Sequence, residues 1–245
     1  VEAFRTYLGE VAAARSKAPS AEAGGAGASG APAGEAAAGA SAAASALIGE
    51  GGAETAPGSE AVPEEVVLAA ERGEEATMLA WLDGGGRVDA TFEYTFSDGS
   101  RASGMTLLMI AMANGHAELA EALLRRGADV SLQKSNGGTA LSLAASNGFE
   151  KLAELTLRHG AEVNQQSKIG NTALMEAAYR GHERVVDTLI RHGAEIDMQD
   201  NDFDTALMAA ALGDRPAVVL RLLRAGADAK LRSVSGDTAL GFAKK

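Results

Sequence analysis

The stretch GNTALMEAAYRGHERVVDTLIRHGA, residues 170–194, decides the fold of this chain. Thr172 stands where its side chain can cap a helix, and Gly181 is suited to ending that helix in a left-handed turn. A second helix follows, with apolar side chains at helical spacing on its inner face: Val185, Val186, Leu189 and Ile190. One such helix pair cannot bury its apolar face alone, so neighbouring pairs must stack on it.

The same pattern recurs along the chain with a period of 33 residues. The threonine of the first helix sets the register at five positions: Thr106, Thr139, Thr172, Thr205 and Thr238. An alanine follows each threonine by five residues, and a Gly-Ala-Asp or Gly-Ala-Glu triplet closes four of the units. An internal repeat of this length indicates a solenoid, and the helical spacing within each unit makes it all-α.

Over residues 63–245 the chain resembles the ankyrin repeat. The residues that carry the resemblance are Gly-x-Thr-Ala-Leu-x-x-Ala-Ala, then Gly-His, then Val-Val-x-x-Leu-Ile-x-x-Gly-Ala-Glu. The resemblance implies a curved solenoid of helix-turn-helix units with protruding hairpins. It also implies protein partners bound across the hairpin tips and the concave helix face. The expected units are 63–103, 104–136, 137–169, 170–202 and 203–235, with a truncated unit at 236–245.

The units depart from the family pattern at two places. The family's Thr-Pro-Leu-His becomes Thr-Ala-Leu-Met at Thr172 and Thr205, so the threonine–histidine hydrogen bond of that motif, which contributes to rigidity between units, cannot form. Asp214-Arg215 replaces the Gly-His of the inter-helix turn in one unit. Aspartate tolerates the left-handed conformation better than most residues, so the turn is expected to survive.

The first unit carries an insertion, because Gly73 precedes its counterpart Gly115 by 42 residues instead of 33. The added segment contains Phe92, Tyr94 and Phe96, which alternate with polar residues. Alternation predicts an extended strand and a longer first hairpin with an aromatic face.

Residues 1–62 differ from the repeats in composition. From about Ala18 to Ala61 the chain is mostly Ala, Gly, Ser and Glu, which predicts a disordered low-complexity tail. Apolar residues at helical spacing within 1–15 predict a short amphipathic helix, which is marginal in isolation. Binding of this helix to a membrane or a partner is a weaker alternative.

Composition excludes several functional classes. The chain has no cysteine, so disulfides, cysteine-based zinc sites and cysteine nucleophiles are excluded. A net charge of −11 argues against nucleic-acid binding, and no apolar run is long enough to span a bilayer. The four histidines fall at structural positions of the repeats, and the acidic run that starts at Asp200 lacks the glycine and glutamate of a calcium loop. We therefore expect no cofactor, no metal and no catalytic site.

Positions that vary between units are the candidates for partner binding, since repetition marks what folding requires. We expect one compact patch on the concave surface, formed by Tyr179, Arg180, Ile169 and Phe203. This patch is the first candidate for partner binding, because interface energy concentrates in a few Tyr, Trp and Arg residues. The aromatic first hairpin is the next candidate. The remaining candidates are Asp200, Asp202, Asn114, Asn147, Lys134 and Lys168, and those of the first hairpin are Phe92, Tyr94 and Phe96.

The leading hypothesis is a non-catalytic, monomeric adaptor or scaffold that binds a protein partner in the cytoplasm, with the nucleus as a second location. The alternative is an accessory targeting or substrate-recognition region of a larger enzyme, such as a kinase or ubiquitin-ligase subunit, whose catalytic part lies outside this chain.

Overall fold

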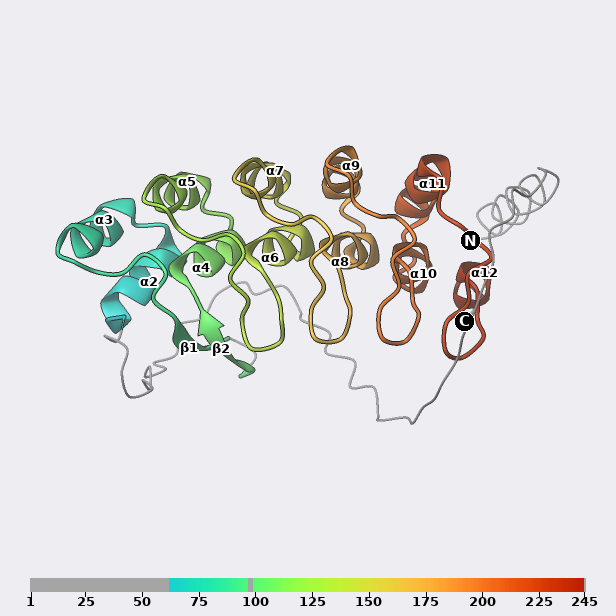
Figure 1. The fold of residues 1–245 in the computed structure, drawn as a ribbon, viewed down its shortest axis with the longest axis horizontal. Coiled ribbons are helices and arrows are strands. Elements are labelled where there is room, and N and C mark those ends of the chain that lie inside the picture. Colours follow the sequence, from blue (N-terminus) through green and yellow to red (C-terminus); the bar gives the residue numbers. More distant parts are fainter. Residues whose placement is uncertain (1–61, 97–98, 245) are drawn as a thin grey trace.

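The computed structural model describes residues 62–96 and 99–244, in which the chain forms a stack of helix pairs (Figure 1). The first helices of the units make one row: α2 (Glu64–Arg72), α4 (Leu107–Asn114), α6 (Ala140–Ser146), α8 (Ala173–Arg180), α10 (Ala206–Leu212) and α12 (Ala239–Phe242). The second helices make the other row: α3 (Glu75–Asp83), α5 (Ala117–Arg125), α7 (Glu150–Arg158), α9 (Glu183–Arg191) and α11 (Pro216–Ala225). The expected all-α solenoid of helix-turn-helix units is confirmed.

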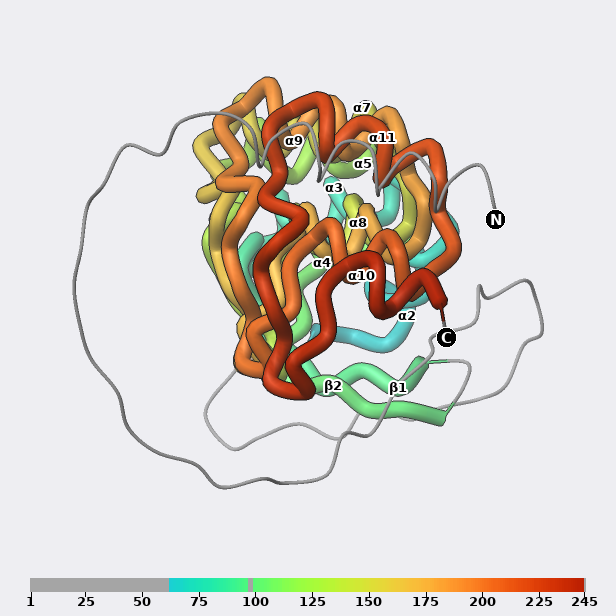
Figure 2. The backbone as a smooth tube through the Cα atoms, turned by 90° about the vertical axis from the view of Figure 1, so that its right-hand side faces the viewer, coloured from blue at the N-terminus to red at the C-terminus, as the bar shows by residue number. Residues whose placement is uncertain are grey.

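Figure 2 looks along the stack and shows the hairpins projecting together beyond the first helices. The tail predicted for residues 1–62 and the helix predicted for 1–15 lie outside the described residues, apart from Val62. Val62 is 2% exposed and belongs to the core, so the packed part of the chain includes it.

Threonine begins the first helix of each full unit for a local reason. The hydroxyl oxygens of Thr106, Thr172 and Thr205 accept hydrogen bonds from the backbone N–H three residues later, at 3.2–3.3 Å. Thr139 does the same for Ser142, whose own hydroxyl accepts from the Thr139 N–H in a capping box. Each cap satisfies a backbone donor that the helix itself leaves without a partner.

The core consists mainly of alanine, leucine, valine and methionine side chains, and its many alanines allow close stacking of the helices. Met109, Met175 and Met208 occupy one repeat position and are at most 4% exposed, so they fill the core. Alanines on the first helices are buried in every full unit, for example Ala144 and Ala177 at 0%. The position of the α8–α10 contact is set by Gly213, where an added Cβ would lie 2.2 Å from the Tyr179 carbonyl oxygen.

The insertion in the first unit forms the predicted hairpin, with β1 (Phe92–Thr95) antiparallel to β2 (Arg101–Met105). A bulge lies between Phe92 and Tyr94. The Ser103 carbonyl oxygen accepts from the Ser135 N–H at 2.7 Å, which joins this hairpin to the next one.

Hydrogen bonds between hairpins link the units in the absence of the family's threonine–histidine bond. One backbone bond joins each tip to the preceding one, at 2.7–3.1 Å: Ser135 to Ser103, Lys168 to Asn136, Asn201 to Ile169 and Val234 to Asp202. Glutamine amides add a second row, since Gln166 donates to Gln199 O at 3.1 Å and Gln199 to Arg232 O at 3.5 Å. The hairpin tips therefore form one continuous ladder.

Candidate interaction surface

The tip of the hairpin that enters α10 is a closed turn built on Asp200. Its Oδ1 accepts from the N–H groups of Asp202 at 2.9 Å and Asp204 at 2.8 Å. Burial raises the pKa of the Asp200 carboxyl, against the effect of these two hydrogen bonds. The Phe203 N–H donates to Asp200 O at 3.0 Å, and the Gln199 amide donates to Phe203 O at 2.8 Å. Asp200 is thus a structural residue of the turn.

Phe203 adopts a backbone conformation that favours glycine. Its φ is 58°, while the glycines at the same repeat position have φ of 74–84°: Gly104, Gly137, Gly170 and Gly236. The hairpin is therefore not rearranged around the phenylalanine, and the side chain is 54% exposed. A left-handed conformation costs a non-glycine residue about 1–2 kcal/mol, and Phe203 keeps it without burying its ring.

Large exposed apolar side chains gather in the last units. In the part of the chain that the structure describes, they are Leu68 at 38%, near the N-terminal end, and five others: Ile169 at 63%, Tyr179 at 41%, Phe203 at 54%, Leu212 at 55% and Val234 at 65%. Ile169, Phe203 and Val234 lie on three consecutive hairpin tips, which the Asn201–Ile169 and Val234–Asp202 backbone bonds place side by side. We call these three residues the tip surface.

Tyr179 and Leu212 form a second group at the C-terminal ends of α8 and α10. The Nε of Arg215, which follows α10, donates to the Tyr179 carbonyl oxygen at 3.1 Å, so the two helix ends are neighbours. Helix α8 has eight residues, and at 1.5 Å per residue it places Tyr179 roughly 12 Å from its hairpin. The single compact patch expected from the sequence is therefore wrong, because Tyr179 and half-buried Arg180 lie apart from Ile169 and Phe203.

The aromatic first hairpin is packed against the core. Phe92 is 8% exposed, and the Tyr94 hydroxyl donates to the Glu71 carboxylate. Burial, followed by that hydrogen bond, raises the pKa of Tyr94. Phe96 meets the Tyr94 ring edge to face at 4.9 Å and lies 5.6 Å from the Lys134 Nζ. Phe92 is not accessible to a partner, and Tyr94, Phe96 and Lys134 stabilise the hairpin.

The other candidate residues either cap the C-terminal end of a helix or lie exposed on a hairpin tip. Asn114 and Asn147 are exposed, and each side-chain amide donates at 2.9 Å to the carbonyl oxygen four residues earlier, which caps its own helix. Lys168 and Asp202 are exposed on their hairpin tips. Leu212, which follows Tyr179 by 33 residues, and Val234 on the last tip are also among the positions that vary between units, and the structure exposes them by 55% and 65%.

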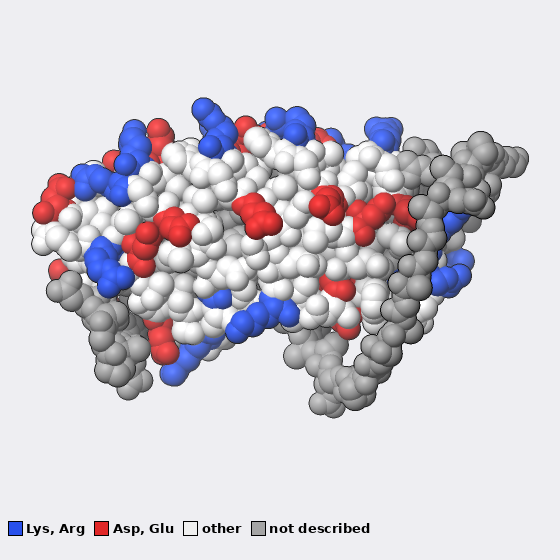
Figure 3. All heavy atoms as spheres, in the orientation of Figure 1, with Lys and Arg blue, Asp and Glu red and all other residues white. Residues whose placement is uncertain are grey.

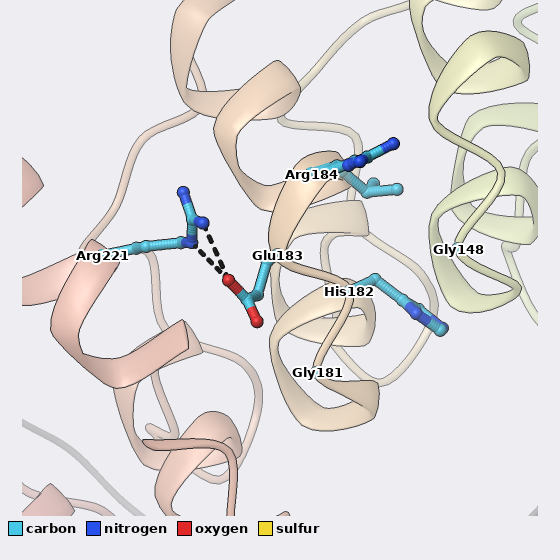
Figure 4. Close-up of a pocket in the computed structure, with 7 residues that line it drawn as sticks. Gly148, Gly181, His182, Glu183, Arg184 and Arg221 are labelled. Atoms are coloured by element: carbon cyan, nitrogen blue, oxygen red, sulfur yellow. Dashed lines mark hydrogen bonds and ion pairs between the residues drawn. The ribbon is translucent and has the colours of Figure 1, made fainter. Parts of the chain in front are cut away.

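The outer helices carry charges of both signs. Figure 3 shows Lys and Arg along the edge of one face and Asp and Glu in a row across it. Arg221 joins α11 to α9 by hydrogen bonds to Glu183, at 2.7 and 3.1 Å, and to Asp187. An open depression of about 370 Å³ beside this ion pair is lined by His182 and Arg184 among others (Figure 4). In this depression Glu183 and Arg221 pair with each other, and the exposed Arg184 lies 4.0 Å from the Glu150 carboxylate.

Histidines have structural partners in this region. The His182 Nε2–H donates to Ser146 O at 2.9 Å, and the ring lies under Gly148, where an added Cβ would be 2.5 Å from it. His116 makes the same contact with Glu71 O at 2.6 Å. Within residues 62–96 and 99–244, we find no group of three or more His, Asp or Glu side chains that could hold a metal ion. None of the described helices has the length and apolarity needed to span a bilayer.

Comparison with known families agrees with this geometry. The family model described as ankyrin repeats (3 copies) matches residues 66–167 and 141–233. No curated protein matches the chain.

Proposed function

Because this chain belongs to the ankyrin-repeat family, whose members are in general protein-interaction modules, we propose that it is a non-catalytic adaptor. It binds a protein partner through the hairpin tips and the ends of the first helices between Ile169 and Val234. The fold itself is typically non-catalytic. The proposal rests on the arrangement of the side chains, described next.

One observation carries the proposal, the distribution of exposed apolar side chains. Five of the six large ones in the described chain lie between Ile169 and Val234, on tips and first-helix ends. Clusters of exposed apolar side chains on a soluble protein mark interaction sites more often than isolated ones do. Tyr179 is the strongest single candidate, since tyrosine is enriched among residues that dominate binding energy.

The test replaces Tyr179 and Leu212 by serine together and measures capture of protein partners by the full chain. The matched control is Leu68→Ser, which changes an exposed apolar residue outside this region. We expect the double variant to lose a specific captured partner by roughly tenfold or more, with its melting temperature unchanged, while the control retains it. Equal capture by both variants would show that the partner binds elsewhere.

A further inference from the structure

We propose that the tip surface of Ile169, Phe203 and Val234 binds a basic, apolar segment of the partner, with an arginine or lysine of that segment placed against the Phe203 ring and the Asp202 carboxylate. The inference rests on the proposed function and adds to it the chemical class of the segment bound. Four observations support it: the conformation of Phe203, the rigidity of the tips, their charge, and their exposed apolar residues.

The conformation of Phe203 is the first. Glycine occupies its repeat position in the four other hairpins, with the same sign of φ. Phe203 keeps the glycine-like φ of 58° while its ring is 54% exposed. Burial within the chain therefore does not offset the conformational cost, and strained residues of this kind cluster where a ligand is bound.

The rigidity of the tips is the second. The backbone of the Phe203 turn is fixed by bonds from Phe203 N to Asp200 O and from Gln199 Nε2 to Phe203 O. The neighbouring tips are attached through Asn201 to Ile169 and through Val234 to Asp202. Three apolar side chains are thus held on a preformed backbone, so a partner binds them without ordering a loop.

The charge of the tips is the third. In the three tips, 166–171, 199–204 and 232–237, four carboxylates stand against two cations: Asp200, Asp202, Asp204 and Asp237 against Lys168 and Arg232. Arg232 is engaged with Gly236 O at 2.7 Å. Asp202 is exposed beside Phe203, and among the described residues no cation forms an ion pair with it. A guanidinium or ammonium group fits beside an exposed ring next to a carboxylate, because it is attracted both to the face of the ring and to the negative charge of the carboxylate.

The exposed apolar side chains are the fourth. Ile169 and Val234 lie on the tips to either side of Phe203, so apolar residues of the segment have contacts on both sides of the cation. The chain's net charge of −11 would steer a basic segment towards it. A second copy of this acidic chain is a poorer occupant, because its own tips carry the same excess of carboxylates.

The experiment titrates three synthetic peptides, (Leu-Xaa-Ser)₄ with Xaa as Arg, Gln or Glu, into the full 245-residue chain and follows amide NMR shifts. We expect the Arg peptide to bind with shift changes at residues 166–171, 199–204 and 232–237, and the Glu peptide not to bind. Phe203→Gly and Asp202→Asn should each weaken binding roughly fivefold or more. Phe203→Gly relieves the backbone strain and restores the residue that the other hairpins carry at this position, so we expect this variant to keep the fold.

Glu162→Gln is the matched control, since Glu162 is an exposed carboxylate on a connecting segment outside the tips. It should leave binding of the Arg peptide unchanged. Absence of binding by the Arg peptide, equal binding by Phe203→Gly, or shift changes away from the tips would each overturn the proposal. So would a concentration-dependent dimer that Phe203→Gly abolishes, which would assign the surface to a second copy. Loss of capture by the Tyr179 and Leu212 double variant tests the proposed function separately, and either result can fail alone.

Discussion

At the scale of single residues, the repeated threonines stabilise the first helices, because their hydroxyl groups accept hydrogen bonds from backbone N–H groups that have no partner within the helix. The threonine at the start of each first helix is 1–7% exposed in the full units, so its hydroxyl satisfies a donor that water does not reach readily. Thr238 occupies the same register in the last unit and makes no side-chain cap hydrogen bond. The two kinds of threonine provide an internal comparison.

We expect Thr172→Ala to lower the free energy of unfolding by about 1 kcal/mol, because it removes the cap on the Met175 N–H. Thr238→Ala should have a smaller effect, since no cap is lost. Urea denaturation of both variants measures the difference. Equal losses would mean that the threonine acts through packing alone.

A second residue-scale prediction concerns pH. Burial lowers the pKa of His182 below its ordinary value, assisted by the nearby Arg180 and Arg215 and opposed by the bond to Ser146. The folded protein therefore binds fewer protons at His182 than the unfolded chain does, and stability should fall as pH drops from about 7 through the ordinary histidine value near 6.5. Thermal melts between pH 7.5 and 5.5 would measure this fall.

The matched variant is His182→Phe, because Phe149 fills the same turn position in the preceding unit and packs under Gly115. It should melt with a weaker dependence on pH over that range than the unchanged chain. A dependence equal to that of the unchanged chain would assign the effect to other groups.

At the scale of elements, glycines at two repeat positions adopt left-handed turns, and those at one of the two positions also set the spacing between units. Gly170 and Gly193 have φ of 84° and 86°. An added Cβ at Gly170 would lie 2.7 Å from the backbone N of Asn201 on the next hairpin, whereas at Gly193 nothing lies within 4 Å. The first glycine allows close approach of two hairpins, and the second supplies only the turn.

Gly193→Ala should therefore destabilise the chain by roughly 1 kcal/mol, from the left-handed backbone alone. Gly170→Ala should cost a further 1–3 kcal/mol or so, because the methyl group displaces the next hairpin and breaks the ladder. Equilibrium unfolding of the two variants gives the difference. If Gly170→Ala is no worse than Gly193→Ala, the hairpins are not held at the distance described.

At the scale of the whole molecule, the first helix of each unit packs against the first helices of the units next to it, as α8 does between α6 and α10. Stability in such a stack is close to a sum of units and the interfaces between them. The last unit contains only the short helix α12 and lacks a second helix among the described residues.

A chain that begins at Val62 should consequently fold without residues 1–61. Its circular dichroism should stay strongly helical, with one cooperative thermal transition. A largely unfolded spectrum would show that the preceding residues are needed for the fold.

The sequence by itself determined the unit: the 33-residue period, the capping threonines, the left-handed glycines and the extra hairpin all follow from rules that act within a few residues. Left-handed Asp214, with φ of 53°, was also foreseen from its residue type. The contacts between units were decided only by the tertiary structure. Phe92 is buried and Lys134 lies over Phe96 because these contacts depend on how one unit sits on the next. The separation of Tyr179 from Ile169, by contrast, follows from the length of α8. The placement of one unit on the next is set by packing of side chains distant in sequence, such as the close approach at Gly213, which no periodic pattern encodes.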